Sequence, residues 1–421
     1  MELGGGVVRA IFGAGLAVLL VVPLAVLSSG PVATQTVLPD AVGEANVERG
    51  TQAGLEVWVQ EFRPRALAAG VSAATFDAAL RGVAFNPKVV ERDRNQNEFS
   101  KTIWDYLDTA VSEDRVALGV RALNDHRALL QRIEAEYGVE KEIVVAVWGL
   151  ESAYGTYRGD LPVLGSLATL AYDGRRAAFF EGELIAALKI VGGGHVKRFD
   201  GSWAGASGHT QFMPSSWERF AVDFDGDGKR NLWGDDPADA LASTANYLRH
   251  WGWTTGQPWG LEVVLPAGFD YDQTTERVVK PVAVWQAMGV RTAAGGDLPD
   301  HGPGSILLPG GARGAAFLIF PNFQVIEHYN TADAYIIGIG HLADRIGGGP
   351  PIAAAWPREL RALTLDERRA LQHLLGLAGF DPGGVDGRMG PKTIAAVKAF
   401  QTARGLVPDG YPSLEVLALL Q

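Results

Sequence analysis

The sequence predicts a mainly α-helical protein with a small β-rich insertion and a separate helical unit at its C-terminal end. Three observations lead to this fold class. Apolar residues recur at helical spacing over 55 to about 137 and again over 139–190. Alternating and β-branched runs, separated by Gly and Pro, are concentrated in 260–320. A GGGPP run at 347–351 then marks a domain boundary.

The composition is that of a soluble globular protein with two or three domains. The chain has 421 residues, of which 47% are hydrophobic and 20% charged, and this length exceeds a single core. A formal net charge of −11 without a basic cluster argues against nucleic-acid binding. The absence of cysteine excludes disulfides, thiolate nucleophiles, cysteine-based metal sites and lipid attachment through an N-terminal cysteine.

The first thirty residues are typical of an export signal. Arg9 precedes an apolar run over 10–27, and small residues for cleavage follow at Ser28 and Gly30. The run is close to the roughly 18–20 residues that a membrane span needs, so an uncleaved anchor is the alternative. In either case the body of the protein is exported. Residues 31–50 are small and polar and are interpreted as a linker.

Helices are expected along most of 51–347, which we interpret as one domain. After the helices up to 137, residues 139–190 form two further pieces around a break at 155–162. Residues 192–236 are mostly loop, with a short helix at 215–222, and helices return at 238–250 and 331–346. Strands are expected at 261–266, 277–285 and 315–320, within an insertion of about 255–322.

The C-terminal unit, 361–421, follows a linker at 348–360 and contains two clear amphipathic helices. They are expected at 363–379 and 391–405, on either side of a turn-rich stretch. Thr364 and Glu367 have the spacing of a capping box at the start of the first helix.

Glu151 is the first candidate for chemistry. It lies in EKEIVVAVWGLESAYG (140–155), where helical spacing places it on one apolar face with Val147 and Leu150. A carboxyl group in an apolar site favours its neutral form and can protonate a glycosidic oxygen near neutral pH. The alternative is a glutamate at a helix end that extends to solvent.

A second candidate stretch is SWAGASGHTQFMPSSW (202–217). Gly205 and Gly208 predict an irregular loop that a ligand can approach closely. Ser202 and Gln211 offer hydrogen bonds, and Trp217 offers a face on which a sugar could stack. The alternative is a packed loop whose aromatic residues fill the core.

A third stretch, DFDGDGKRNLWGDDPAD (223–239), has the spacing of a calcium loop. Three aspartates occupy positions 1, 3 and 5, Gly228 supplies the turn at position 6, and Lys229 and Asn231 follow at positions 7 and 9. Gly234 stands at position 12 in place of a glutamate, so the closing ligand must be Asp235, Asp236 or Asp239. The alternative is a solvated acidic turn.

Residues 321–330 (PNFQVIEHYN) are expected to run from a strand into a turn ending in Tyr329 and Asn330. His195, His209 and His341 lack the spacing of a metal site and are interpreted as ordinary residues.

Taken in order, ESAYG, GASGHTQFMPSSW, DFDGDGKRNLW, ADALASTANYL and NFQVIEHYN resemble the lytic murein transglycosylase B family, glycoside hydrolase family 103, over about 55–346. The C-terminal VDGRMGPKTIAAVKAFQ is similar to the three-helix peptidoglycan-binding domain. The resemblance implies a lysozyme-like α+β catalytic core, and peptidoglycan strands as the partner. It implies contact with a membrane only through the N-terminal segment, if uncleaved, and a periplasmic location.

The resemblance also implies the roles of individual residues. Glu151 matches the catalytic acid/base. The matches to glycan-contacting positions are Arg175, Arg176, Ser202, Gln211, Tyr247, Tyr329 and Asn330. The matches to a calcium loop are Asp223, Asp225, Asp227, Lys229 and Asp239, the last standing two residues later than a gapless alignment would place it.

The implied reaction is cleavage of the β-1,4 bond between N-acetylmuramic acid (MurNAc) and N-acetylglucosamine (GlcNAc) with formation of a 1,6-anhydro ring. It needs one carboxyl group and no organic cofactor, with Ca²⁺ as a possible structural ion. If Asp160, Asp173 or Glu181 lay across the cleft, hydrolysis by water would be the alternative. The alternative outside the enzymes is a non-catalytic scaffold that binds the wall through its C-terminal unit.

Overall fold

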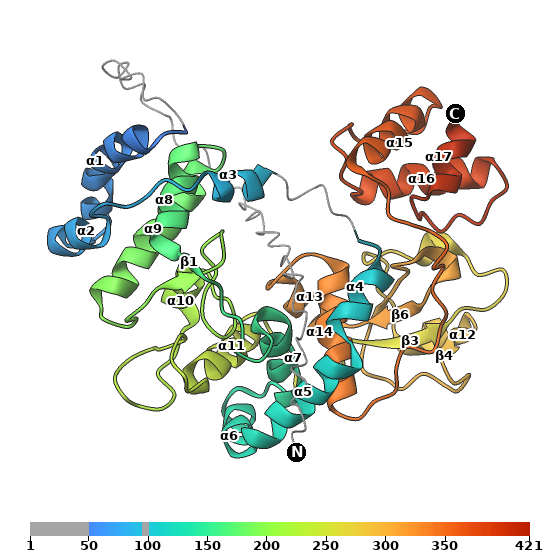
Figure 1. The fold of residues 1–421 in the computed structure, drawn as a ribbon. Coiled ribbons are helices and arrows are strands. Elements are labelled where there is room, and N and C mark those ends of the chain that lie inside the picture. Colours follow the sequence, from blue (N-terminus) through green and yellow to red (C-terminus); the bar gives the residue numbers. More distant parts are fainter. Residues whose placement is uncertain (1–49, 95–100) are drawn as a thin grey trace, which may run out of the picture.

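The computed structural model describes residues 50–94 and 101–421, which form a largely helical molecule with a small sheet (Figure 1). The predicted export signal and most of the predicted linker at 31–50 lie outside these residues. Among the described helices, none combines the length and apolar character needed to cross a bilayer.

A first core lies between the N-terminal helices and a helical pair from the middle of the chain. Phe62 and Phe76 pack with Leu167, Phe180 and other buried residues of this cluster. The helices of this core are α1 (Gln52–Ala68), α2 (Ala73–Ala79), α8 (Val163–Asp173) and α9 (Ala177–Gly192), with α3 (Pro87–Arg94) lying against α8. Figure 1 shows them grouped at one side of the molecule.

A second, larger core surrounds α7 (Lys141–Ser152), in which every residue from Ile143 to Ser152 is buried. The helix is therefore enclosed on all sides, whereas the sequence predicted a single buried face. The surrounding helices are α4 (Ile103–Ala110), α5 (Glu113–Asp125), α6 (Arg127–Tyr137), α10 (Pro214–Phe220), α11 (Ala238–His250), α13 (Pro321–Glu327) and α14 (Asp333–Ile346).

The break after α7 contains a strand that the sequence did not reveal. Strand β1 (Leu161–Pro162) pairs antiparallel with β2 (Asp200–Gly201), and Leu161 lies opposite Gly201. This short ribbon fixes the start of the 202–217 loop beside the chain that leaves α7. Residues 139–190 thus form three helices, not the two expected pieces, because Gly174 ends α8 in a left-handed conformation (φ 87°).

The insertion holds a four-stranded antiparallel sheet with the order β4-β3-β6-β5. Side chains of β6 alternate: Phe317 and Ile319 enter the main core, while Ala316 and Leu318 face a small core of the insertion. The strands are β3 (Gly260–Val264), β4 (Arg291–Thr292), β5 (Ser305–Leu307) and β6 (Ala316–Ile319), accompanied by η1 (Tyr271–Gln273) and η2 (Gly311–Arg313).

One strand prediction and one turn prediction were wrong, and both errors involve a proline at the start of a helix. Residues 277–285 were expected to be extended, but α12 (Val282–Ala287) begins after Pro281 and buries Trp285. Residues 321–330 were expected to run from a strand into a turn; the strand is present as β6, but Pro321 occupies the first position of α13. Proline has no N–H for a sheet and favours the first turn of a helix.

The C-terminal unit is a three-helix domain with its own core around Leu371, Val397 and Phe400. The predicted capping box of Thr364 and Glu367 is confirmed. Its helices are α15 (Leu365–Leu377), α16 (Pro391–Ala403) and α17 (Leu414–Leu420).

This domain rests on the β insertion (Figure 1). The buried Lys398 ammonium donates to the Tyr271 carbonyl at 2.6 Å and to Thr274 Oγ1 at 3.1 Å. Asp409 accepts from the Ala312 N–H at 2.9 Å. The insertion is thus a platform that holds the C-terminal domain.

Candidate active site

Glu151 lies in the last turn of α7, and its side chain is only 9% exposed. The structure buries this carboxyl group, in contrast to the solvent-extended alternative. The Tyr335 hydroxyl, from the first turn of α14, donates to Glu151 Oε1 at 2.5 Å. Burial raises the pKa of Glu151 to about 7, and the hydrogen bond from Tyr335 opposes part of that rise. The group can therefore both give and take a proton near neutral pH.

Three tyrosine hydroxyls lie near enough to Glu151 for its charge to affect their pKa values. Burial raises the pKa of Tyr106, Tyr329 and Tyr335, and the negative charge of Glu151 raises each of them further. The three hydroxyls therefore stay protonated and uncharged. They can donate hydrogen bonds without adding a second charge next to the acid.

The turn after Glu151 has an unusual backbone. Ala153 (φ 49°), Tyr154 (φ 58°) and Gly155 (φ 81°) are three successive left-handed residues, and this conformation is uncommon for residues other than glycine. The Tyr154 hydroxyl donates to the Arg115 carbonyl at 2.7 Å, and its ring lies where a side chain on Gly149 would be. The turn thus folds back onto α7 and α5 and ends the helix directly behind Glu151.

The 202–213 loop is held by the side chains that the sequence assigned to the glycan. Ser202 Oγ accepts from the N–H groups of Ala204 at 3.3 Å and Ala206 at 3.1 Å. Gln211, in a left-handed conformation, donates through Nε2 to the carbonyls of Arg158 at 3.1 Å and Gly208 at 2.9 Å. Their contacts with substrate remain predictions.

Trp217 differs from its predicted role. It is 3% exposed, and its indole N–H donates to the Arg230 carbonyl at 2.9 Å. Helix α10 turns this side chain inward, and it fills the core between α10 and the acidic loop. Trp217 is therefore a packed core residue, as in the alternative interpretation of this stretch.

Tyr247, Tyr329 and Asn330 gather beside the loop. The rings of Tyr247 and Tyr329 are 4.9 Å apart, and the Tyr247 hydroxyl donates to the His328 carbonyl at 2.5 Å. The Tyr329 hydroxyl lies 3.3 Å from the Thr210 carbonyl, which joins this cluster to the 202–213 loop. Asn330 is buried and accepts from the Ala332 N–H at 3.0 Å. Tyr329 links this cluster to the acid, because the charge of Glu151 acts on its hydroxyl.

The arginine pair occupies a different setting. Arg175 donates to both carboxylate oxygens of Asp93 at 2.5 Å, and Arg176 donates to Asp93 Oδ1 at 2.8 Å. Asp93 is 1% exposed, so α3 anchors both guanidinium groups at the start of α9. Among the described residues, no recorded hydrogen bond joins this pair to Glu151, and its contact with glycan remains a prediction.

Sequence reasoning missed Asp93 and Tyr335. Asp93 follows Val89 and Val90 at the spacing of a helical face, which could have indicated that it is buried. Tyr335 is separated from Glu151 by 184 residues, and no local pattern reports such a contact.

The three acids considered as a second catalytic carboxyl group have other surroundings. Asp173 pairs with Arg94 at 2.6 Å, Glu181 pairs with Arg65 at 2.8 Å, and Asp160 is exposed. None of the three is recorded in a hydrogen bond with the group around Glu151. None of these three acids is therefore placed as the partner of Glu151 in a two-carboxylate reaction.

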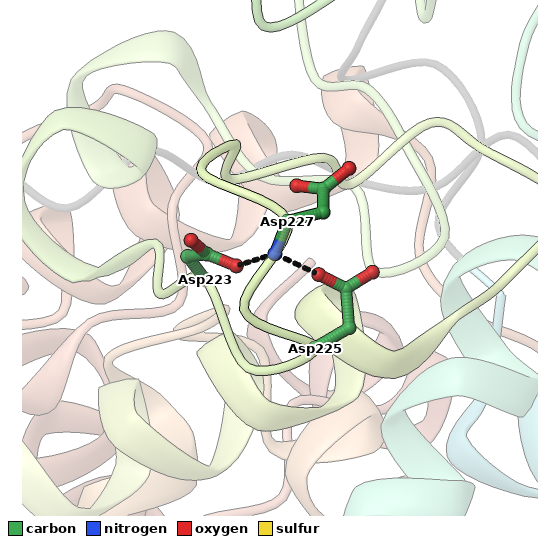
Figure 2. A group of neighbouring side chains, drawn as sticks. All are labelled: Asp223, Asp225 and Asp227. Carbon is green, nitrogen blue, oxygen red and sulfur yellow. Dashed lines mark hydrogen bonds between the residues drawn. The ribbon is translucent and has the colours of Figure 1, made fainter.

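The acidic loop brings Asp223, Asp225 and Asp227 together, with one carboxylate oxygen of each within 4.8 Å of the others. Figure 2 shows Asp223 and Asp225 both accepting from the backbone N–H of Asp227, at 3.1 and 3.0 Å. Gly228 has φ 85°, which fits the sharp turn expected at position 6. Three exposed carboxylates so close together repel unless a cation lies between them, and oxygen donors suit Ca²⁺.

The side chains of Asp239 and Asn231 accept hydrogen bonds from backbone N–H groups of the same loop. Asp239 is 2% exposed and accepts from the N–H groups of Phe224, Asp225 and Asn231 at 2.7–3.3 Å. Asn231 Oδ1 accepts from the N–H groups of Trp233 and Gly234. The Asp239 carboxylate therefore holds the acidic loop by accepting from the loop's backbone N–H groups. Its role as the closing ligand remains a prediction.

Comparison with known proteins bears on this arrangement. Residues 54–344 match the transglycosylase SLT domain family, and residues 364–420 match a family described as a putative peptidoglycan-binding domain. Membrane-bound lytic murein transglycosylase B of Escherichia coli (strain K12) is 35% identical over 250 residues, which is 57% of this chain and 66% of that protein.

Solved structures are similar over more of the chain. SltB3 from Pseudomonas aeruginosa, in complex with NAG-anhNAM-pentapeptide, has a TM-score of 0.85 and 49% identity over 87% of this chain and 99% of its own. Escherichia coli Slt35, in complex with calcium, has a TM-score of 0.60 and 30% identity over 69% and 92%. The chain therefore belongs to the lytic transglycosylases of the SLT family and carries a peptidoglycan-binding domain behind its catalytic domain.

Proposed function

We propose that this enzyme cleaves the β-1,4 bond between MurNAc and GlcNAc and leaves a 1,6-anhydroMurNAc end, with Glu151 as the only catalytic carboxyl group. The observation that carries the proposal is the burial of Glu151, which brings its pKa to about 7. Further support comes from SltB3, whose structures contain NAG-anhNAM-pentapeptide and NAG-NAM-pentapeptide.

The reaction uses Glu151 twice. Protonated Glu151 first gives its proton to the glycosidic oxygen, the C1–O bond breaks, and GlcNAc leaves as an alcohol. The N-acetyl carbonyl of MurNAc stabilises the positive charge at C1. The Glu151 carboxylate then takes the proton of the C6 hydroxyl as that oxygen bonds to C1. The ring closes, no water is consumed, and Glu151 is again protonated.

Tyr335 orients Glu151 during both steps. Its hydroxyl holds Oε1, so the opposite oxygen, Oε2, is the one left to exchange protons with the substrate. The same bond stabilises the carboxylate that forms after the first step. The seven predicted glycan contacts, from Arg175 to Asn330, belong to this proposal as binding residues.

Product analysis tests the proposal. The wild-type enzyme acting on purified sacculi is expected to release muropeptides with anhydro ends, seen by mass spectrometry, and Glu151→Gln is expected to release none. Reducing MurNAc ends would instead indicate a hydrolytic muramidase. Release of products by the Gln variant would remove Glu151 from the mechanism.

We also propose that the acidic loop binds a structural Ca²⁺ through Asp223, Asp225, Asp227 and the Lys229 carbonyl, with Asp239 as the candidate closing ligand. The convergence of three exposed carboxylates supports it, and Slt35 was solved with calcium. The ion would neutralise these carboxylates and stiffen the loop. The ion takes no part in the proton transfers, which Glu151 performs.

The location proposed for the enzyme is the periplasm. The N-terminal run over 10–27 would direct export, as a cleaved signal or as an anchor. The relative from Escherichia coli is a lytic murein transglycosylase by name. The five ordered motifs also support assignment to glycoside hydrolase family 103.

A further inference from the structure

His209 belongs to the 202–213 loop, lies against α7 and is 4% exposed. The Trp148 indole N–H points at its Nδ1 at 3.1 Å, and its Nε2 lies 2.8 Å from the Gly234 carbonyl. An indole N–H only donates and a carbonyl only accepts, so Nδ1 must be bare and Nε2 must carry the hydrogen. One neutral tautomer therefore satisfies both partners.

Burial lowers the pKa of His209 and the positive charge of Arg158 lowers it further, so Arg158 disfavours a second proton on the His209 ring. Its guanidinium lies 3.2 Å from His209 Nε2 and donates to the Gly234 carbonyl at 2.7 Å. A second positive charge at this place would be repelled. The imidazole is thus held as a fixed, uncharged connector between Trp148 and Gly234.

The backbone of His209 makes a second connection to the same helix. Its carbonyl accepts from Ser152 Oγ at 2.5 Å, and Ser152 Oγ in turn accepts from the Gly155 N–H at 2.9 Å. A Cβ on Gly155 would lie 2.5 Å from His209 Nδ1, so only glycine permits this approach. Trp148 and Ser152 stand on either side of Glu151, and His209 therefore holds the helix at both positions.

We infer that His209 is a positioning residue for Glu151. It fixes the last turn of α7 against the loop that carries Ser202 and Gln211, and so sets the place of the acid relative to the glycan. A displacement of the order of 1 Å in a reacting group can lower the rate by roughly 100-fold. The inference rests on the proposed role of Glu151.

Two substitutions, one at each partner, remove the Trp148–His209 hydrogen bond. His209→Leu leaves the Trp148 N–H without an acceptor, and Trp148→Phe removes the N–H itself. On soluble, uncross-linked peptidoglycan strands, each variant is expected to lose roughly 10- to 100-fold in kcat with KM changed less than about twofold. Because both changes break the Trp148–His209 bond, the double variant is expected to lose much less than the product of the two single losses.

Conservative replacements separate positioning from loss of volume. The Asn oxygen in His209→Asn can occupy the place of Nδ1 and accept from Trp148, whereas the Gln side chain in His209→Gln reaches toward Gly234 instead. Asn is expected to restore most of kcat and Gln is not, a comparison that holds even if the Leu variant does not fold. His301→Leu, a histidine of the β insertion that packs on Phe320, serves as the control with unchanged kcat.

Wild-type kcat in folded His209→Leu, independent effects of the two single changes, or a Gln variant as fast as the Asn variant would each overturn the inference. Glu151→Gln, assayed in parallel, keeps the two proposals apart. If it is inactive while the His209 variants have full activity, only the positioning role fails. If it is active, the proposed function itself fails.

Discussion

Replacing Tyr335 with phenylalanine removes one hydroxyl and leaves the packing of α14 in place. That hydroxyl is the donor to Glu151 Oε1 at 2.5 Å, and it favours the charged form of the acid. Its removal must therefore raise the pKa of Glu151 above about 7. A hydrogen bond to a charged group contributes about 1.5–3 kcal/mol, which corresponds to about one to two pH units.

The pH dependence of kcat/KM measures this effect. A general acid acts in its protonated form, so activity is retained below the pKa of Glu151 and is lost as the pH rises through it. The alkaline limb of the wild-type profile is expected near pH 7. In Tyr335→Phe it should move to higher pH by about one to two units, with a lower maximum because the carboxyl group is less firmly oriented.

Tyr137→Phe is the matched control, because that hydroxyl pairs with Glu136 and not with Glu151. Its alkaline limb should coincide with that of the wild type. A Tyr335→Phe profile whose alkaline limb stays in place, or moves to lower pH, would refute the role given to this hydrogen bond.

Three further predictions concern stability. The pKa of Glu151 is higher in the folded chain (about 7) than its ordinary value of 4.5, so its contribution to stability is complete below about pH 4.5 and is lost as the pH rises through 7. Glu151→Gln should therefore match the wild type in thermal denaturation at pH 4.5 and exceed it at pH 8 by up to about 3 kcal/mol; equal stability at both pH values would contradict the burial of a charged acid. A chelator should lower the Tm of the wild type but not that of Asp223→Asn, which lacks a carboxylate of the acidic loop; a wild-type midpoint that does not respond would count against the cation. Lys398→Glu would place a negative charge near Asp270, Asp272 and Asp409 and should release the C-terminal domain, seen as faster proteolysis of 348–360, whereas an unchanged cleavage rate would show that the domain is held by other contacts.

The sequence predicted the features that local pattern controls. The α11 bounds, the capping box at Thr364 and the position of Glu151 on a buried helix all follow from periodicity and caps within a few residues of each other. The comparisons confirm the transglycosylase and peptidoglycan-binding families that the ordered motifs predicted. The assignment of single residues to glycan contacts stays a prediction.

The features that the sequence did not predict depend on contacts between distant parts of the chain. The β1–β2 ribbon joins residues forty positions apart in sequence, and two residues in a strand leave no periodic signal. Metal spacing gives no signal for His209, but the structure connects it to Trp148 and Ser152 beside Glu151 and to the Gly234 carbonyl. Pro281 and Pro321 start the two helices that the sequence did not predict, and at Pro281 the β-branched residues on both sides masked this helix-start signal.

The central claim is that one carboxyl group, Glu151, closes a ring without consuming water. Digestion of purified sacculi in water labelled with heavy oxygen, followed by mass spectrometry, tests it most directly. The wild-type enzyme should release anhydroMurNAc ends that carry no label, and Glu151→Gln should release nothing. Labelled reducing ends from the wild type, or anhydro products from Glu151→Gln, would contradict the claim.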